Sequence, residues 1–145
     1  MSYSIDVNIL LYASSEDAPE YPVARPLVDQ LLAGPDLLCL SWATLSGYLR
    51  LSTNPVATTF PLTTERATAN VTALLERPRT RLLVEEEGFW RVYGDLLVQH
   101  RARGKFVPDV HLAALLRQHG VRTLYTHDRD FRRFDFLDVR DPFAA

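Results

Sequence analysis

The sequence lacks the features that mark several large classes of protein. Its 145 residues include a single cysteine, Cys39, so no disulfide framework can form within the chain, which favours a reducing compartment. Cys39 lies in the apolar segment Leu37–Leu40 and is interpreted as a buried core residue rather than a reactive thiol. No apolar run approaches the roughly 20 residues that span a bilayer. The N-terminus has no basic region followed by an apolar one, so we expect a cytoplasmic protein.

A strong net charge is also missing. The chain has 16 Lys and Arg against 18 Asp and Glu, which gives a net charge of -2. A protein with so little excess charge binds nucleic acid only through a local basic patch. The candidate patch is the run Arg101, Arg103 and Lys105, for which the alternative interpretation is a solvated loop.

The residues that are present indicate one globular domain over residues 1–145. Hydrophobic residues make up 47% of the chain and charged residues 23%. Short apolar segments alternate with amphipathic ones, which predicts a three-layer α/β/α sandwich around a mainly parallel sheet. Strands are expected directly before Asp6 and over 37–40, 81–84, 121–125 and 136–139. Helices are expected from Val7, over 23–32, after the N-cap Ser41, after Thr63 or Thr64, over 89–97, and from Pro108 to Gly120.

Three acids stand at junctions between these elements. Asp6 directly follows the first strand, and Asp128 directly follows the fourth. Asp109 opens the helix that leads into the fourth strand. Right-handed crossovers place the ends of parallel strands on one edge of the sheet, so we expect Asp6 and Asp128 to lie near each other. Each acid also has a local interpretation, because Asp6 and Asp109 can cap helices and Asp128 with Asp130 can cap a turn.

Carboxylates gathered in this way have a defined chemistry. They repel one another and raise each other's pKa unless a cation neutralises them. Hard oxygen ligands favour Mg²⁺ or Mn²⁺, with water and phosphate oxygens completing the coordination. Such an ion lowers the pKa of a bound water and stabilises charge on a phosphate under in-line attack. The spacing therefore predicts metal-assisted chemistry on a phosphate, while the separate capping roles remain the alternative.

Four segments of the chain resemble, in order and spacing, the motifs of PIN domains. They are Asp6–Ala13 (DVNILLYA), the helix Ser41–Ser52 followed by Thr53-Asn54-Pro55, Pro108–Leu115 (PDVHLAAL) and Thr126–Phe131 (THDRDF). The resemblance covers nearly the whole chain and is greatest to VapC-type toxins of bacterial toxin–antitoxin pairs.

This resemblance implies a Mg²⁺-dependent endoribonuclease, with Mn²⁺ as a substitute, that cleaves RNA phosphodiester bonds. It also implies a homodimer, neutralised by a VapB-type antitoxin whose C-terminal segment blocks the acidic groove. By matching position, the catalytic and metal-binding carboxylates are Asp6, Asp109 and Asp128. The residues expected to support them are Asn8, Thr126 and Asp130, of which Asn8 and Thr126 would orient ligands or water by hydrogen bonding.

One position departs from the family's pattern. The second acid of the family is a glutamate on the third helix, and this chain has Gly47 in its place. We therefore expect a one-metal site with water where the carboxylate is missing, and weaker activity. Arg50, about one turn further on, is a candidate phosphate contact, for which the alternative is a solvated surface arginine. The departure leaves a second function open: an inactive PIN fold that binds RNA or its antitoxin.

Other chemistries fit the residues less well. A phosphoryl-accepting receiver domain needs a lysine near its last strand, but the only lysine, Lys105, precedes the helix of Asp109. A haloacid-dehalogenase-type phosphatase needs an aspartate two residues after its nucleophile, where this chain has Asn8. No pair of histidines has zinc-binding spacing. His127, next to Asp128, is interpreted as a surface or packing residue, with a proton shuttle as the alternative.

Overall fold

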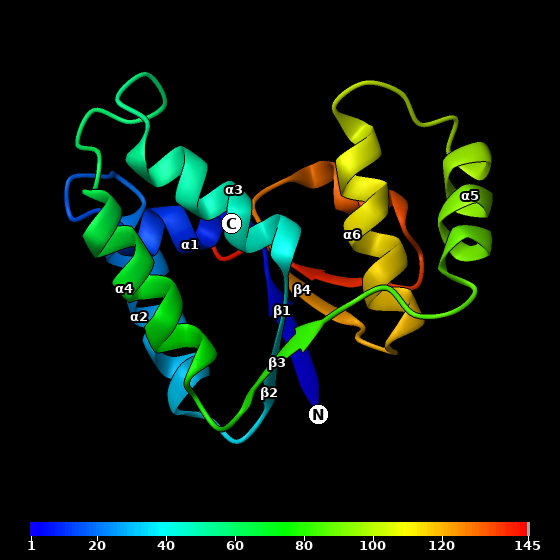
Figure 1. The fold of residues 1–145 in the computed structure, drawn as a ribbon, viewed down its shortest axis with the longest axis horizontal. Coiled ribbons are helices and arrows are strands. Elements are labelled where there is room, and N and C mark those ends of the chain that lie inside the picture. The colour runs from blue at the N-terminus through cyan, green and yellow to red at the C-terminus, as the bar shows by residue number, and fades with distance from the viewer. Residues whose placement is uncertain (145) are drawn as a thin grey trace.

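The computed structural model of the protein, which describes residues 1–144, has a five-stranded parallel sheet at its centre (Figure 1). The spatial order of the strands is β3-β2-β1-β4-β5, and every neighbouring pair is parallel. The strands are β1 (Ser2–Ile5), β2 (Leu37–Ser41), β3 (Thr80–Leu83), β4 (Thr123–Tyr125) and β5 (Asp138–Arg140).

Helices cover both faces of the sheet, so the predicted three-layer α/β/α sandwich is confirmed (Figure 1). One side carries α1 (Val7–Ser14), α2 (Tyr21–Ala33), α3 (Trp42–Thr53) and α4 (Thr64–Leu75). The other carries α6 (Phe106–Gln118) with α5 (Phe89–Gln99) outside it, and the short helix η1 (Arg129–Arg133). Within residues 1–144, none of the helices combines the length and apolarity required to cross a membrane.

The two faces of the sheet bury separate apolar cores. In β2, Leu38 and Leu40 point into the core beneath α1 to α4, whereas Cys39 between them points into the core beneath α5 and α6. Cys39 is 4% exposed, and burial raises the pKa of its thiol, which supports the interpretation as a core residue. This alternation follows from the two-residue period of a strand buried on both faces.

Two helices, α3 and α4, begin directly after the N-cap residues expected from the sequence. Ser41 caps α3 by accepting a hydrogen bond from the amide of Thr44 at 3.1 Å. Thr63 caps α4 in the same way through the amide of Arg66. Both side chains satisfy amides that have no partner within their helix.

The beginning of α6 differs from the prediction. The helix begins at Phe106, two residues before Pro108, so Asp109 lies in its first turn rather than opening it. Phe106 is 7% exposed and stacks on Phe134, with 5.6 Å between the ring centroids, so tertiary packing adds residues to the helix. Pro108 is tolerated because the amides of the first turn have no acceptor within the helix.

The last strand also differs in position. It spans Asp138–Arg140 instead of 136–139, because Phe136 is partly buried against the core while the amide of Asp138 donates to the carbonyl of Arg122. The strand lies at the edge of the sheet as predicted.

The order of the strands reverses beside β1. From β1 the chain builds outwards to β2 and β3, and then returns to add β4 and β5 on the other side. A reversal of this kind leaves an opening at the carboxyl ends of the two central strands, where open α/β sheets bind ligands. Ile5 pairs with Tyr125, and the amide of Asp6 donates to the carbonyl of Tyr125 at 2.9 Å. Asp6 and Thr126 therefore leave the sheet side by side, and Asp128 follows close enough for its charge to raise the pKa of Asp6, in line with the expected proximity of the two acids.

Candidate metal centre

Asp6 lies directly after β1, at the carboxyl edge of the sheet. Its Oδ1 accepts a hydrogen bond from the amide of Val7 at 2.8 Å, which caps α1, and its Oδ2 accepts one from the hydroxyl of Thr126 at 2.7 Å. The residue is 8% exposed. Burial raises the pKa of this carboxyl, while the hydrogen bonds from Thr126 and Val7 oppose that rise. The capping role of Asp6 and its position at the carboxyl edge of the sheet are thus compatible.

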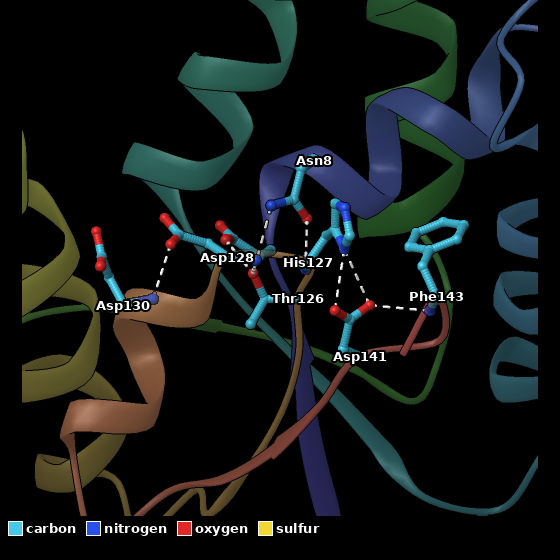
Figure 2. Close-up of polar contacts among 8 residues, drawn as sticks. Asn8, Thr126, His127, Asp128, Asp130, Asp141 and Phe143 are labelled. Carbon is cyan, nitrogen blue, oxygen red and sulfur yellow. Dashed lines mark hydrogen bonds and ion pairs between the residues drawn. The ribbon is translucent and has the colours of Figure 1, made fainter. Parts of the chain in front are cut away.

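Thr126 is the centre of a hydrogen-bonded group that we call the Thr126 network, made of Asp6, Asn8 and Thr126 (Figure 2). Its fully buried hydroxyl donates to Asp6 and accepts from the Asn8 side-chain amide at 3.4 Å and the Asp128 backbone amide at 3.0 Å. Asn8 accepts a further bond from the backbone amide of His127 at 3.3 Å. The network therefore fixes the chain from Thr126 to Asp128 against the start of α1.

Three other carboxylates converge above it, and we call them the acid cluster: Asp109, Asp128 and Asp130. One oxygen from each lies within 4.8 Å of the others. Asp109 comes from the first turn of α6, and the other two come from the start of η1. Asp128 also caps η1, because its Oδ1 accepts the amide of Asp130 at 2.9 Å. The local turn predicted for this segment is what brings its two acids together.

The electrostatics of the acid cluster are unfavourable without a cation. Burial, followed by the charges of Asp128, Asp6 and Asp130, raises the pKa of Asp109 to about 7, with Lys105 opposing the rise. Among residues 1–144 no side chain or backbone amide donates a hydrogen bond to this carboxylate. Carboxylate oxygens are the ligands that Mg²⁺ and Mn²⁺ prefer, so the donor set fits a hard divalent cation.

The structure therefore brings together most of the predicted site. Asp109 and Asp128 lie in the acid cluster, and Asp130, expected only to support them, is its third member. Asp6 lies close enough for its charge to raise the pKa of Asp109, but it is outside the group of converging oxygens. Their roles toward a metal remain predictions.

Two residues of α3, Gly47 and Arg50, were considered as part of the site. A Cβ atom added to Gly47 would lie 3.6 Å from Cγ2 of Val7, the residue after Asp6, which is ordinary contact distance. The missing carboxylate thus leaves room beside the site. Arg50 is exposed and forms no ion pair within residues 1–144. Its candidate contact with phosphate stays a prediction.

One neighbouring residue was not found from the sequence. Asp141 accepts hydrogen bonds from the ring of His127, at 3.0 and 3.1 Å to its two oxygens (Figure 2). The two residues are 14 positions apart, and no local pattern connects them. Their meeting depends on β5 returning the chain to the carboxyl edge of β4, a tertiary effect.

Comparisons with known proteins agree with this geometry. Residues 3–137 match the family described as PIN domain. The chain is 42% identical over 145 residues to Ribonuclease VapC48 of Mycobacterium tuberculosis, covering 100% of both chains. It is 33% identical over 138 residues to Ribonuclease VapC43 of the same species, covering 95% of this chain and 93% of the relative.

Solved structures share the fold at lower identity. The sarcin-ricin loop cleaving toxin VapC20 of Mycobacterium tuberculosis superposes with a TM-score of 0.70 at 19% identity, over 95% of this chain and 98% of that one. The toxin–antitoxin complex VapBC-1 of nontypeable Haemophilus influenzae gives a TM-score of 0.67 at 23% identity, over 99% and 100%. With a family match over residues 3–137 and full-length relatives of this kind, the chain belongs to the PIN domain family, as a VapC-type member.

Proposed function

We propose that this protein is a metal-dependent endoribonuclease toxin that cleaves RNA phosphodiester bonds with Mg²⁺, or with Mn²⁺ as a substitute. The observation that carries the proposal is the acid cluster at the carboxyl edge of the sheet, where burial and the charges of neighbouring acids raise the pKa of Asp109 to about 7. A cluster of carboxylates that repel one another in this way is stabilised by binding a divalent cation.

The residues of the site have separate tasks in this proposal. Asp109, Asp128 and Asp130 supply the converging oxygens, and Asp6 adds a fourth carboxylate beneath them. When bound, a divalent cation supplies Lewis-acid activation of water and neutralises charge on a phosphate. Asn8 and Thr126 hold the segment that bears Asp128, so the donor oxygens are oriented before substrate arrives.

The substrate class and the partner are supported by the relatives. Two relatives that match over nearly the whole chain are named ribonucleases, and structures of the same fold include VapBC-1 and a toxin–antitoxin complex from Klebsiella pneumoniae. We infer that RNA is the substrate and that a VapB-type antitoxin neutralises the protein, both in the cytoplasm. Arg50, exposed on α3 and free of ion pairs within residues 1–144, is available for phosphate.

We also infer a homodimer. The support is a pair of large apolar residues, Trp42 and Val84, which are 55% and 49% exposed. They directly follow the paired strand residues Ser41 and Leu83. Light scattering of the purified toxin should give the mass of two chains, and of one chain for Trp42→Glu if this pair lies in the interface.

A second function is favoured by one specific observation, the glycine at position 47. Without a carboxylate on α3, the site could hold a cation or RNA without turnover, and the protein would be a binding module. This alternative differs from the first only in catalysis.

Metal titration with an RNA substrate separates the two functions. We expect cleavage that depends on Mg²⁺ or Mn²⁺ and is strongly reduced in Asp128→Asn, because the substitution removes one carboxylate of the acid cluster. Asp138→Asn, an exposed acid in an ion pair on β5, is the matched control and should cleave normally. Binding of Mn²⁺ without cleavage by the wild type would instead identify the binding module.

A further inference from the structure

Close to its end, the chain buries a charged side chain that the proposed chemistry does not use. The carboxylate of Asp141, after β5, is only 9% exposed. Its oxygens accept from Nδ1 of His127 at 3.0 and 3.1 Å, and Oδ1 also accepts from the amide of Phe143 at 2.9 Å (Figure 2). Withdrawing a carboxylate from water is costly unless it is hydrogen-bonded, and these contacts provide that compensation.

Aromatic packing strengthens the same junction. The ring of His127 lies edge-on to Phe143, with 5.0 Å between centroids, and to Tyr12 of α1 at 6.4 Å. Tyr12 and Phe143 also meet edge-on at 5.6 Å. Three segments distant in sequence are thereby joined: α1, the turn after β4, and the segment after β5. We call Asp141, His127 and Phe143 the C-terminal clasp.

The C-terminal clasp and the Thr126 network both contact the segment from Thr126 to Asp128. Asp141 and Phe143 hold the side chain of His127, while Asn8 holds its backbone amide at 3.3 Å. On either side of His127 stand Thr126, bonded to Asp6, and Asp128, whose amide is bonded to Thr126. Rotation of the backbone at His127 would therefore move both Thr126 and Asp128.

We propose that Asp141 is a positioning residue for the acid cluster: by fixing His127, it fixes the backbone that carries Asp128 and Asp130. The inference deepens the proposed function and rests on it for the identity of the cation. Partners outside the ligand sphere that orient ligands contribute about 10–100-fold to metal affinity in known sites. The alternative is that the C-terminal clasp only fastens the end of the chain.

Two variants separate positioning from charge. Asp141→Ala removes both the charge and the acceptor, whereas Asp141→Asn removes the charge but keeps an oxygen that accepts from His127 and Phe143. Mn²⁺ binding, followed by the electron paramagnetic resonance of the free ion, should weaken by about tenfold or more in Asp141→Ala and by less than about threefold in Asp141→Asn. The matched control is Asp138→Ala, which deletes an exposed acid three residues away and should bind like the wild type.

A second measurement examines the metal-free protein. The amides of Asp128 and Asp130 donate to side chains within this segment, so their hydrogen exchange reports its order. Exchange should accelerate in Asp141→Ala and in His127→Ala, but not in Asp138→Ala. The effect of the double variant, His127→Ala with Asp141→Ala, should be smaller than the sum of the two single effects, because both substitutions remove the contact between His127 and Asp141.

Each outcome decides the inference. If Asp141→Ala bound Mn²⁺ as tightly as the wild type, the C-terminal clasp would only fasten the end of the chain. If Asp141→Ala and Asp141→Asn lost equal affinity, the negative charge of Asp141 would matter and not its hydrogen bonds. Either result would overturn the positioning role. If the wild type bound no Mn²⁺, the metal proposal would fail by itself. Amide hydrogen exchange would then be the remaining test. Faster exchange at Asp128 in Asp141→Ala would support the ordering of this segment by the C-terminal clasp, and unchanged exchange would overturn it.

Discussion

Asp6 and Asp109 lie at the same edge of the sheet, yet their surroundings differ completely. Both oxygens of Asp6 accept hydrogen bonds from the protein, from Val7 and from Thr126. Asp109 has no such donor within residues 1–144, and it faces the charges of Asp128 and Asp130. The fold has thus completed the Thr126 network by itself and left the acid cluster dependent on a cation. Loss of a Thr126 network residue should therefore cost stability, whereas loss of the Asp109 carboxylate should cost only function.

The largest effect is expected at Asp109. Asp109→Asn removes one carboxylate oxygen that would bind the metal. Residues that only orient such ligands contribute up to about 100-fold, so loss of the ligand itself should lower RNA cleavage by more than that. Relief of repulsion should leave the melting temperature of the metal-free protein unchanged or raised at neutral pH. Cleavage assays and thermal melts of the same sample check both parts. A variant that unfolds would contradict the contrast between the two regions.

Thr126→Val should affect both properties. The substitution preserves shape but removes the buried hydroxyl, leaving Oδ2 of Asp6 and the amide of Asp128 each without a partner. We expect a loss of about 1–3 kcal/mol in the free energy of unfolding. Cleavage should also fall, by about 10–100-fold, because Asp128 loses its support. Denaturant unfolding measures the free energy of unfolding. Wild-type stability in Thr126→Val would contradict the structural role of the Thr126 network.

The pH dependence of stability should come from the acid cluster. Because the pKa of Asp109 is raised in the folded state, the native protein keeps a proton that the unfolded chain loses between about pH 4 and about pH 7. Stability of the metal-free protein should therefore fall as pH rises through that window. Thermal melts at both ends, with and without Mg²⁺, measure the effect. In Asp109→Asn the fall should be reduced, and Mg²⁺ should offset it in the wild type only.

The smallest effect is expected from restoring a carboxylate to α3. Gly47→Glu places an acid where a Cβ has room, so it should strengthen Mn²⁺ binding a few-fold and raise cleavage. Gly47→Ala and Gly47→Gln are the matched controls. The alanine variant should only stabilise the helix, by about 0.5–1 kcal/mol. If Gln served as well as Glu, the benefit would come from the helix and not from an added ligand.

The sequence predicted the fold more completely than the site because the two depend on different ranges of interaction. The cap at Ser41 and the burial of Cys39 in an apolar segment were predicted from local signals, and both were confirmed. The beginning of α6 was misplaced because burial of Phe106, a tertiary contact, extends the helix.

At the site, strand ends were predictable but distances were not. Parallel topology placed Asp6 beside the residues that follow β4. The turn that Asp128 caps was predicted from the sequence, but the convergence of Asp130 with Asp109 also depends on where α6 packs, which has no sequence signature. The bond between His127 and Asp141 was missed for the same reason: it crosses from one strand end to another.

The central claim is that the acid cluster binds a divalent cation, and Mn²⁺ titration tests it most directly. Wild-type protein should bind Mn²⁺ with release of protons near about pH 7, since Asp109 must lose its proton to bind, and with little release near about pH 8.5. Asp109→Asn should bind far more weakly and release none. Equal Mn²⁺ binding by the wild type and Asp109→Asn, or no binding by either, would contradict the account.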